Sequence, residues 1–430
     1  MSAGSIKRVV SDLKTLPRQF WILAAGIFVY LVGTEMTYPY ETLYLNGELG
    51  VPMTTIGLIL GVALLATVPL QVAGGALCDK VGRRPVLIVA ILGSMVLYFG
   101  LGVTRDLTAI VVLIVLEAAF GWAQFLTASN AMIADMTTPA QRAEAFSVSR
   151  MALNAGITLG PLFALPLLAA DPSFRLNFYA SGIVVAGFLV LVLTALRETR
   201  PAAVKRVSVT ASFRGYGVVL RDRTMMAFCL ITLLPLYAFG QIWATMPVML
   251  SDLHDVGAQR WSVAMVLYGL SMVALQYPVI RTLGEGDHML LLSLSCLAMG
   301  AGAGASAFVP WPATLACIAS IALGIVLLLP IASTVVSRLA PVDLRGRYMG
   351  AWTIVYMGGY ALGPLLGGWA LDDLGGHVAF SVVAAACFTG AVLFPLLRGG
   401  VRRRAAETAR TEAEAALRAG LPADRPGPTV

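Results

Sequence analysis

The chain has 430 residues, of which 58% are hydrophobic and only 12% are charged, about half the charged share of a soluble domain. This balance, with a mean hydropathy of +0.82, excludes an ordinary soluble protein and predicts that most of the chain lies in a membrane. The net charge of +7 comes from small basic clusters between apolar segments, which argues against nucleic acid as a partner.

Twelve apolar segments are each long enough, at about 20 residues, to cross a bilayer as a helix. In chain order they are 20–44, 55–78, 85–103, 108–133, 145–168, 176–196, 224–250, 262–280, 289–308, 314–336, 348–371 and 378–397. The first is too long for the apolar part of a signal peptide and lacks a small-residue cleavage site, so we expect it to be retained. The sequence predicts an all-α integral membrane protein.

Lys and Arg accumulate in alternate loops, as expected if those loops face the cytoplasm. With the N-terminus placed inside, all but three of the 30 basic residues lie on the cytoplasmic side, and the exceptions are Arg105, Arg175 and Arg260. We therefore expect a multi-pass protein of the cell membrane with both termini in the cytoplasm.

A charged interval divides the segments six and six. We expect a cytoplasmic N-terminal segment (1–19), a six-helix bundle (20–196), a cytoplasmic central loop (197–223), a second six-helix bundle (224–397) and a partly disordered cytoplasmic tail (398–430). Four residues of the first half recur in the second at an offset of 203, which predicts an internal repeat in parallel orientation. They are Arg142, Gly156, Gly160 and Pro161, matched by Arg345, Gly359, Gly363 and Pro364.

The loop after the second segment reads GGALCDKVGRRP and contains Gly75, Asp79, Gly82, Arg83 and Arg84. A turn that only marks the cytoplasmic side needs just the two arginines. The whole pattern resembles the signature G-x-x-x-D-x-x-G-R-[KR] of the major facilitator superfamily, and the twelve segments and the repeat extend this resemblance over nearly the whole chain. The resemblance implies twelve helices in two pseudo-symmetric six-helix bundles, with this loop as a cytoplasmic gate.

Three further charged residues take a role from the same resemblance. It places Asp135, at the end of the fourth segment, in a charge network with Asp79 and Arg83 of the loop. It also assigns Arg142 to this network and gives its repeat partner Arg345 the same role in the second half. The alternative is that Asp135 is a solvated acid at the end of its helix, without a role in the network.

The fifth segment carries Asn154, Gly156, Gly160 and Pro161, which resemble the glycine-proline motif of the drug:proton antiporter branch. Phe163 and Ala164 depart from that motif. The related copy in the eleventh segment is more complete, with Gly359, Gly363, Pro364, Gly367 and Gly368. The motif favours export, while close helix packing by small residues is the alternative explanation.

Two acids lie inside predicted spans, where ionisable groups are costly and often functional. They are Glu35 in the first segment and Glu117 in the fourth, and the resemblance implies that both line the central cavity. We expect them to carry the coupling proton. Glu117 stands where the antiporter branch usually has arginine, and a hydrogen-bonded structural acid is its alternative. Glu41 and Glu48 are interpreted as solvated residues at the external mouth.

The second half has aromatic and amide side chains instead of acids in its span interiors. A cavity with acids on one wall and aromatic residues on the other suits hydrophobic or cationic compounds better than sugars. The residues we expect to line it are Tyr38, Trp122, Tyr237, Gln241, Trp243, Gln276 and Tyr356.

The combined features predict a secondary active transporter that exports hydrophobic or cationic small molecules in exchange for protons. The alternatives are a proton-linked transporter of a metabolite (a sugar, amino acid or organic acid) or a lipid, and, more distantly, a polytopic membrane enzyme or a sensor. Neither a nucleotide motif nor paired cysteine or histidine ligands are present, so we expect no metal or other cofactor and a proton gradient as the driving force. The expected partners are the substrate, protons and the lipid bilayer, and we expect a monomer that is not an enzyme.

Overall fold

The computed structural model describes residues 15–139, 141–200, 216–283 and 286–418. Most of the predicted N-terminal segment, the middle of the predicted central loop and the end of the predicted tail lie outside these ranges. The described residues form helices and contain no strand. This arrangement confirms the predicted all-α fold class.

Ten helical segments among the described residues are long and apolar enough to cross a membrane. One of them, Arg345–Thr408, has 64 residues and is interrupted at Gly375, whose φ of 77° is a left-handed conformation that favours glycine. This break separates the eleventh and twelfth predicted spans. The helix α14 (Ala258–Leu283) has 26 residues and corresponds to the eighth predicted span.

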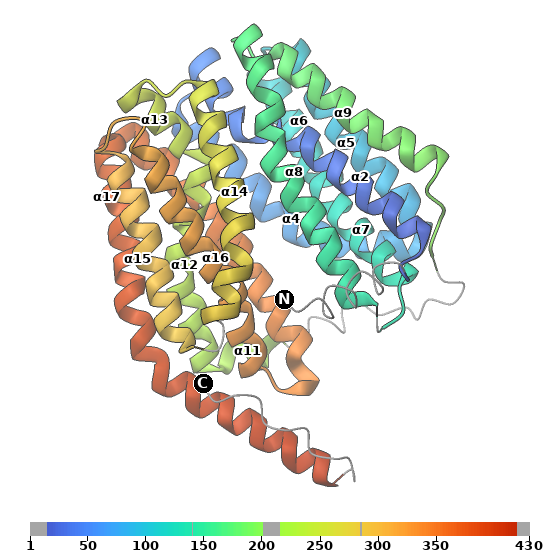
Figure 1. Ribbon diagram of the computed structural model, residues 1–430, viewed down its shortest axis with the longest axis vertical. Coiled ribbons are helices and arrows are strands. Elements are labelled where there is room, and N and C mark those ends of the chain that lie inside the picture. The colour runs from blue at the N-terminus through green and yellow to red at the C-terminus, as the bar shows by residue number, and fades with distance from the viewer. Residues whose placement is uncertain (1–14, 140, 201–215, 284–285, 419–430) are drawn as a thin grey trace. The chain divides into compact units, whose positions relative to one another are not determined.

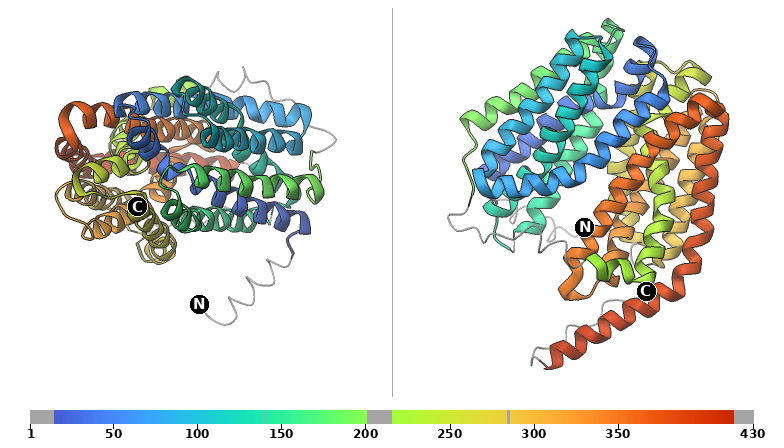
Figure 2. Two further views of the ribbon diagram at one scale, coloured as in Figure 1. Left: turned by 90° about the horizontal axis from the view of Figure 1, so that it is seen from above. Right: turned by 180° about the vertical axis from the view of Figure 1, so that it is seen from behind.

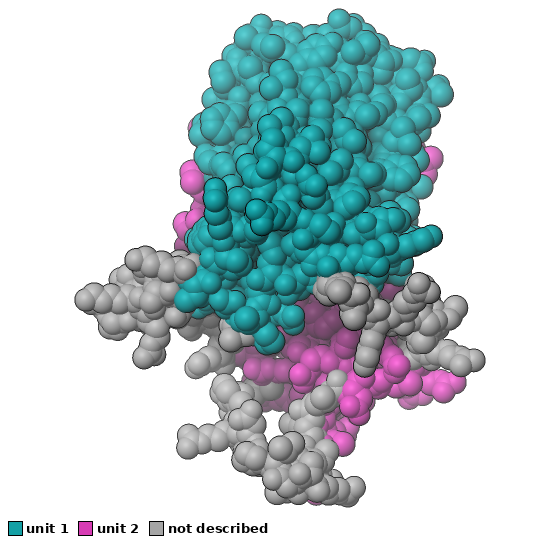
Figure 3. Space-filling view, turned by 90° about the vertical axis from the view of Figure 1, so that its right-hand side faces the viewer, with its two compact units in different colours: residues 1–51, 62–206, 257–269 teal, residues 52–61, 207–256, 270–430 magenta. Residues whose placement is uncertain are grey.

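The chain divides into two compact units (Figure 3). The helices that belong wholly to unit 1 are α2 (Arg18–Glu35), η1 (Tyr38–Tyr40), α3 (Glu41–Leu43), the π-helical turn η2 (Tyr44–Glu48), α5 (Arg83–Val103), α6 (Leu107–Phe120), α7 (Trp122–Met136), α8 (Arg142–Ala170) and α9 (Arg175–Thr194). Within this unit α2 packs against both α8 and α9, and α5 packs against α9 (Figure 1). The first predicted span is thus central to its own bundle.

The helices that belong wholly to unit 2 are α11 (Tyr216–Arg221), α12 (Arg223–Ala244), α13 (Met246–His254), α15 (His288–Ser306), α16 (Thr314–Leu339), η3 (Val342–Leu344) and α17 (Arg345–Arg418). Here α12 packs along α17, and α15 packs against α16 and α17. The helix α12 of unit 2 therefore corresponds to α2 of unit 1.

Two helices are shared between the units. The start of α4 (Met53–Val81) belongs to unit 2, where Asp372 accepts hydrogen bonds from the backbone N–H groups of Met53 (3.1 Å) and Thr54 (2.7 Å). The start of α14 belongs to unit 1, where Gly269 lies so close to Thr158 on α8 that a Cβ at this position would collide with it.

The helix α17 continues past the ends of its neighbours in unit 2 (Figure 2). Its extension is tied to them by two aspartates that also cap helix N-termini, Asp222 on α12 and Asp287 on α15. The Nε of Arg404 lies 3.2 Å from Asp222, and Arg398 forms an ion pair with Asp287. The predicted tail therefore begins as an ordered continuation of the last span.

Candidate functional site

The first predicted span is broken directly after Glu35. The helix α2 ends at this residue, and a 3-10 turn, a short α-helical turn and a π-helical turn follow before residue 49. Two side chains of α9 hold the broken backbone: the Asn177 amide donates to the carbonyl of Met36, and the hydroxyls of Thr37 and Ser181 lie 2.8 Å apart. Irregular backbone at membrane depth is tolerated where protein groups satisfy it in this way.

The beginning of α14 holds the same break from another side, within unit 1. The indole Nε1 of Trp261 donates to the carbonyl of Pro39 over 2.9 Å, and the hydroxyls of Tyr40 and Ser262 lie 2.6 Å apart. Both contacts are buried. Residues 36–40 are thus fixed between α9 and the part of α14 that unit 1 contains.

The Glu35 side chain lies at this break and is 7% exposed. Its Oε2 atom is buried and has no hydrogen-bond partner among the described residues. Burying a carboxyl oxygen without a partner is costly, and burying a carboxylate without one is costlier still. Position 35 therefore favours a neutral carboxyl or one that a cation approaches.

Glu117 lies at a second helix break, where its carboxyl accepts hydrogen bonds. Helix α6 ends at Phe120, Gly121 has a non-helical ψ of −104°, and α7 begins at Trp122. The Oε1 atom of Glu117 accepts the Trp122 backbone N–H over 3.0 Å and lies 3.4 Å from the Ser94 hydroxyl. This carboxyl joins the two parts of the fourth span.

A tyrosine extends the Glu117 contacts to the first span. The Tyr30 hydroxyl lies 2.7 Å from the Ser94 hydroxyl, and its ring stacks on Phe125 with ring centroids 3.8 Å apart. Half-buried Glu117 and buried Ser94 and Tyr30 thus form a polar chain across α6, α5 and α2.

Glu41 is the acid that the sequence interpretation missed. The interpretation of it as a solvated residue at the external mouth is wrong, because Glu41 is only 7% exposed, whereas Glu48 is exposed as expected. The signal was hidden because the 3-10 and π-helical turns change which face of the span each residue occupies.

The predicted gate residues Arg83, Asp79 and Asp135 meet at one point of unit 1. The Arg83 guanidinium lies 3.1 Å from Asp79 and 2.8 Å from Asp135, and it also donates to the carbonyl of Cys78 over 2.9 Å. Arg83 is 6% exposed and the Asp135 side chain 15%, so this ion pair is largely shielded from water, whereas the Asp79 side chain is 50% exposed. Gly82 has a φ of 107°, which explains why this turn requires glycine.

The other predicted gate residues have different surroundings. Arg84 donates to the carbonyls of Val192 (3.2 Å) and Leu193 (2.8 Å) at the end of α9, and Arg142 donates to the carbonyl of Ala134 (3.3 Å). Gly75 has no atom of unit 1 within 4 Å of a Cβ built on it, and Arg345 is exposed at the start of α17.

The glycine-proline motifs make equivalent helix contacts in the two units. In unit 1 a Cβ on Gly160 would lie 2.5 Å from the Glu35 Cβ, and one on Gly156 would collide with Leu31. In unit 2 a Cβ on Gly363 would lie 2.5 Å from the Gly240 Cα, and one on Gly359 would lie 2.5 Å from the Leu236 Cβ. Glu35 and Gly240 therefore occupy equivalent positions in the two units.

Unit 2 contains three aromatic residues predicted for the cavity, Tyr237, Trp243 and Tyr356, and further aromatic residues beside Tyr356. Phe239 on α12 lies 5.0 Å from Tyr360 and 6.4 Å from Tyr356 on α17, measured between ring centroids, and Trp352 lies 6.5 Å from Tyr356. Tyr237 and Trp243 on α12 are each 9% exposed. Phe239, Trp352, Tyr356 and Tyr360 form an aromatic surface along the contact between α12 and α17.

The remaining cavity predictions have mixed positions. Gln241 is 2% exposed and donates from Nε2 to the carbonyl of Gly363 over 3.2 Å, so it connects α12 and α17. Tyr38 and Trp122 in unit 1 and Gln276 in unit 2 are half-buried.

Comparison with known proteins agrees with this architecture. A family model described as Major Facilitator Superfamily matches residues 23–284 and 230–425. Similar curated proteins include the uncharacterized MFS-type transporter YttB of Bacillus subtilis, which is 26% identical over 375 residues covering 84% of this chain and 90% of that protein. Another is the multidrug resistance protein MdtH of Aeromonas hydrophila, which is 29% identical over 365 residues covering 82% and 87% of the two chains.

A solved structure has the same fold. The crystal structure of a peptide transporter POT in complex with sulfate matches with a TM-score of 0.75 and 14% identity, over 90% of this chain and 96% of that chain. The predicted family is confirmed. The family match along both halves, the all-helical fold and the repeated glycine contacts together show that this chain belongs to the major facilitator superfamily of transporters.

Proposed function

We propose that this transporter exports hydrophobic or cationic small molecules in exchange for protons, with Glu35 as the principal proton carrier. In this mechanism, the two bundles alternate between access to the cytoplasm and access to the outside. Proton and substrate occupy the Glu35 region in turn, because a buried carboxyl is stable there when it is protonated or when a cation lies beside it.

The observation that carries the proposal is the unpartnered, buried Oε2 atom of Glu35. Packing does not explain an acid at this position. At the equivalent contact in unit 2, Gly240 faces Gly363 and the two helices pack closely without any acid. An ionisable group that costs stability and is not needed for packing is a candidate for proton transfer.

Glu117 is the second proton site in this proposal. Its carboxylate accepts the Trp122 N–H, which connects α6 and α7 across the break at Gly121. A protonated carboxyl is a weaker acceptor, so proton uptake here would loosen the connection between the two parts of the fourth span. Proton binding at this site would thereby be coupled to bending of the span.

The proposed substrate class follows from the contrast between the units. The helices α12, α15 and α16 of unit 2 contain neither Asp nor Glu, and α12 and α17 present the aromatic surface of Phe239, Trp352, Tyr356 and Tyr360. Aromatic faces attract organic cations and apolar rings, while the carboxyls of unit 1 supply negative charge. The name of the relative MdtH, a multidrug resistance protein, supports the same class.

The remaining elements of the proposal concern the gate and the setting. We assign to Arg83, with Asp79 and Asp135, the role of a cytoplasmic gate whose ion pairs change as the bundles alternate. The orientation with both termini in the cytoplasm rests on the distribution of Lys and Arg. We also propose that the protein is a monomer and that it lies in the cell membrane.

Efflux of a fluorescent lipophilic cation from cells that express the chain tests the proposal. Wild-type cells should extrude the dye in a manner that an uncoupler abolishes, and Glu35→Gln should lose this efflux. The matched control is Glu48→Gln, which changes an exposed acid of the same span and should retain efflux.

Membrane levels of all three proteins are compared by immunoblot. If Glu35→Gln reaches wild-type levels and retains uncoupler-sensitive efflux, Glu35 is not the principal proton carrier. If correctly inserted wild-type protein extrudes no lipophilic cation, the proposed substrate class is wrong.

A further inference from the structure

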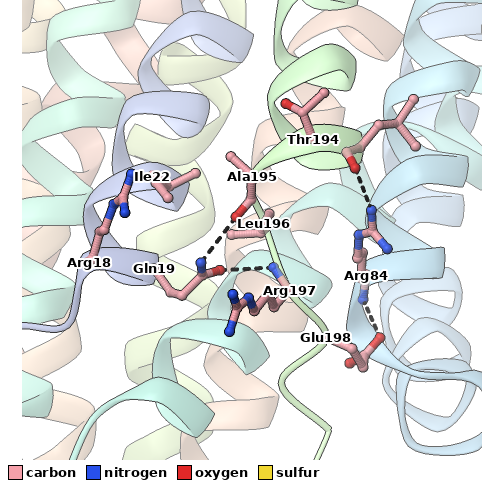
Figure 4. A pocket seen from close by; sticks show the side chains of 10 residues that line it. Arg18, Gln19, Ile22, Arg84, Thr194, Ala195, Leu196, Arg197 and Glu198 are labelled. Atoms are coloured by element: carbon pink, nitrogen blue, oxygen red, sulfur yellow. Dashed lines mark hydrogen bonds between the residues drawn. The ribbon is translucent and has the colours of Figure 1, made fainter.

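Unit 1 contains a pocket of about 530 Å³ where α2 and α5 begin and α9 ends (Figure 4). Its lining comes from three parts of the chain: Arg18, Gln19 and Ile22 of α2, Arg84 of α5, and residues 193–198 at and after the end of α9. None of these residues belongs to the proposed proton sites. The pocket shares only Arg84 with the predicted gate loop.

Hydrogen bonds fix the walls of the pocket. The Gln19 side chain donates to the carbonyl of Ala195 over 3.0 Å and accepts the backbone N–H of Arg197 over 2.8 Å, as Figure 4 shows. On the opposite wall the Arg84 guanidinium donates to the carbonyls of Val192 and Leu193. The end of α9 is thus attached to both other helices, and the pocket is preformed.

The pocket has an excess of positive charge. The side chains of Arg18 and Arg197 make neither a hydrogen bond nor an ion pair with the described part of the chain, and Arg84 bonds only to neutral carbonyls. Three guanidinium groups around one pocket without a carboxylate partner are suited to a phosphate, which accepts their paired N–H donors.

The acid in the lining, Glu198, forms no ion pair with these arginines, and its one negative charge leaves the lining with a net positive charge. Its carboxylate accepts the backbone N–H groups of Arg83, Arg84, Thr199 and Arg200 at 2.9 to 3.0 Å. Partial desolvation opposes ionisation, but these four bonds outweigh it and lower the pKa of Glu198 below its ordinary value of 4.5. Glu198 therefore remains charged and accepts hydrogen bonds from the N-terminus of α5.

The pocket lies at the level where the spans end. Candidate spans begin at Arg18 and Arg83 and end at Thr194. Trp21, one turn into α2, is 42% exposed, as expected of an aromatic residue at a membrane interface, and Leu193 is 52% exposed. The basic groups thus adjoin apolar surface that faces acyl chains, on the side predicted to face the cytoplasm.

We propose that this pocket binds the phosphate headgroup of an anionic phospholipid of the cytoplasmic leaflet. Arg18, Arg84 and Arg197 surround the phosphate, and the acyl chains lie along Ile22 and Leu193. Basic pockets between spans at this membrane surface bind such headgroups in other proteins. A lipid fits the site better than a free phosphate because the apolar surface is continuous with the charged groups.

Native mass spectrometry of the full-length protein tests the proposal with phosphatidylglycerol and with phosphatidylcholine of the same acyl chains. Wild-type protein should retain one phosphatidylglycerol molecule with at least a fivefold preference. The double variant Arg18→Gln/Arg197→Gln should lose this preference, and Arg18→Lys/Arg197→Lys should keep part of it. The matched control Arg221→Gln/Arg223→Gln removes two exposed arginines of unit 2 and should behave like wild type.

The proposal is overturned by equal retention of the two lipids by wild-type protein, by an equal loss of the preference in the control variant, or by an unchanged preference in Arg18→Gln/Arg197→Gln. Glycerol phosphate in solution distinguishes the source of the phosphate. If it displaces no phosphatidylglycerol at millimolar concentration, the site is specific for a lipid. If it binds as tightly as the lipid, the site takes a free anion and the lipid assignment is wrong. Monodisperse elution of each variant confirms folding.

Discussion

Gly160 of α8 and Glu35 of α2 meet at the point where the first span breaks. A Cβ on Gly160 would lie 2.5 Å from the Glu35 Cβ and 2.8 Å from the Glu35 carbonyl carbon. The fifth span therefore packs directly on the residue proposed to carry the proton. A shift between these two helices changes the surroundings of the carboxyl, which is what coupling of proton binding to bundle movement requires.

Gly160→Ala should reduce both stability and efflux, because the added methyl group has no space between α8 and α2. Overpacking of this kind costs about 1–3 kcal/mol. Thermal unfolding of the purified protein in detergent measures the loss. Gly187→Ala is the control, since a Cβ at position 187 meets no atom within 4 Å. Equal melting temperatures for both variants would contradict the close contact.

Arg83→Gln should be strongly destabilising because it leaves Asp135 without its buried ionic partner. Removing one member of a buried pair costs about 3–5 kcal/mol. The double variant Arg83→Gln/Asp135→Asn should lose less than the sum of the two single changes, as measured by a double-mutant cycle of thermal unfolding. Strict additivity would show that the 2.8 Å contact contributes no coupling energy.

Glu117→Gln should lose less stability than Glu117→Leu. The glutamine Oε1 can still accept the Trp122 N–H, but leucine leaves the first turn of α7 without its side-chain acceptor. Loss of a capping group costs about 0.5–2 kcal/mol. Thermal unfolding compares the two variants, and a melting temperature for Glu117→Leu equal to that of Glu117→Gln would exclude a capping role.

The stability of unit 1 should fall on acidification in part through Glu198. The four N–H bonds lower the pKa of Glu198 in the folded state below the ordinary value of 4.5. Its contribution is therefore present above pH 4.5 and is lost as the pH falls through the folded-state pKa. Glu198→Gln should be less stable than wild type at neutral pH, and the difference should shrink below that value. A difference that stays constant with pH would contradict this ionic role.

Much of the fold could be predicted because the membrane imposes simple rules. The length of the apolar segments predicted the spans, and four residues that recur at an offset of 203, Arg142 and Arg345 among them, predicted the repeat. The contact of Arg83 with Asp79 could be foreseen from their separation of one helical turn.

Other features depend on the three-dimensional backbone. The break after Glu35 lies four residues before Pro39, whose ring and missing N–H prevent a regular helix there, but the contacts with Asn177 and Trp261 that hold the break are far away in sequence. The burial of Glu41 follows from that break. Gln241 looked like a cavity residue, but its amide connects two helices, because polar groups within a bundle also stabilise helix contacts.

Proton movement by the purified protein tests the central proposal most directly. In proteoliposomes with a pH-sensitive dye inside, addition of a lipophilic cation should drive protons in the opposite direction in wild-type protein. Glu35→Gln should abolish this proton flux, and Glu48→Gln should preserve it. Cation-driven proton flux of wild-type size in Glu35→Gln would contradict the assignment of Glu35 as the principal proton carrier.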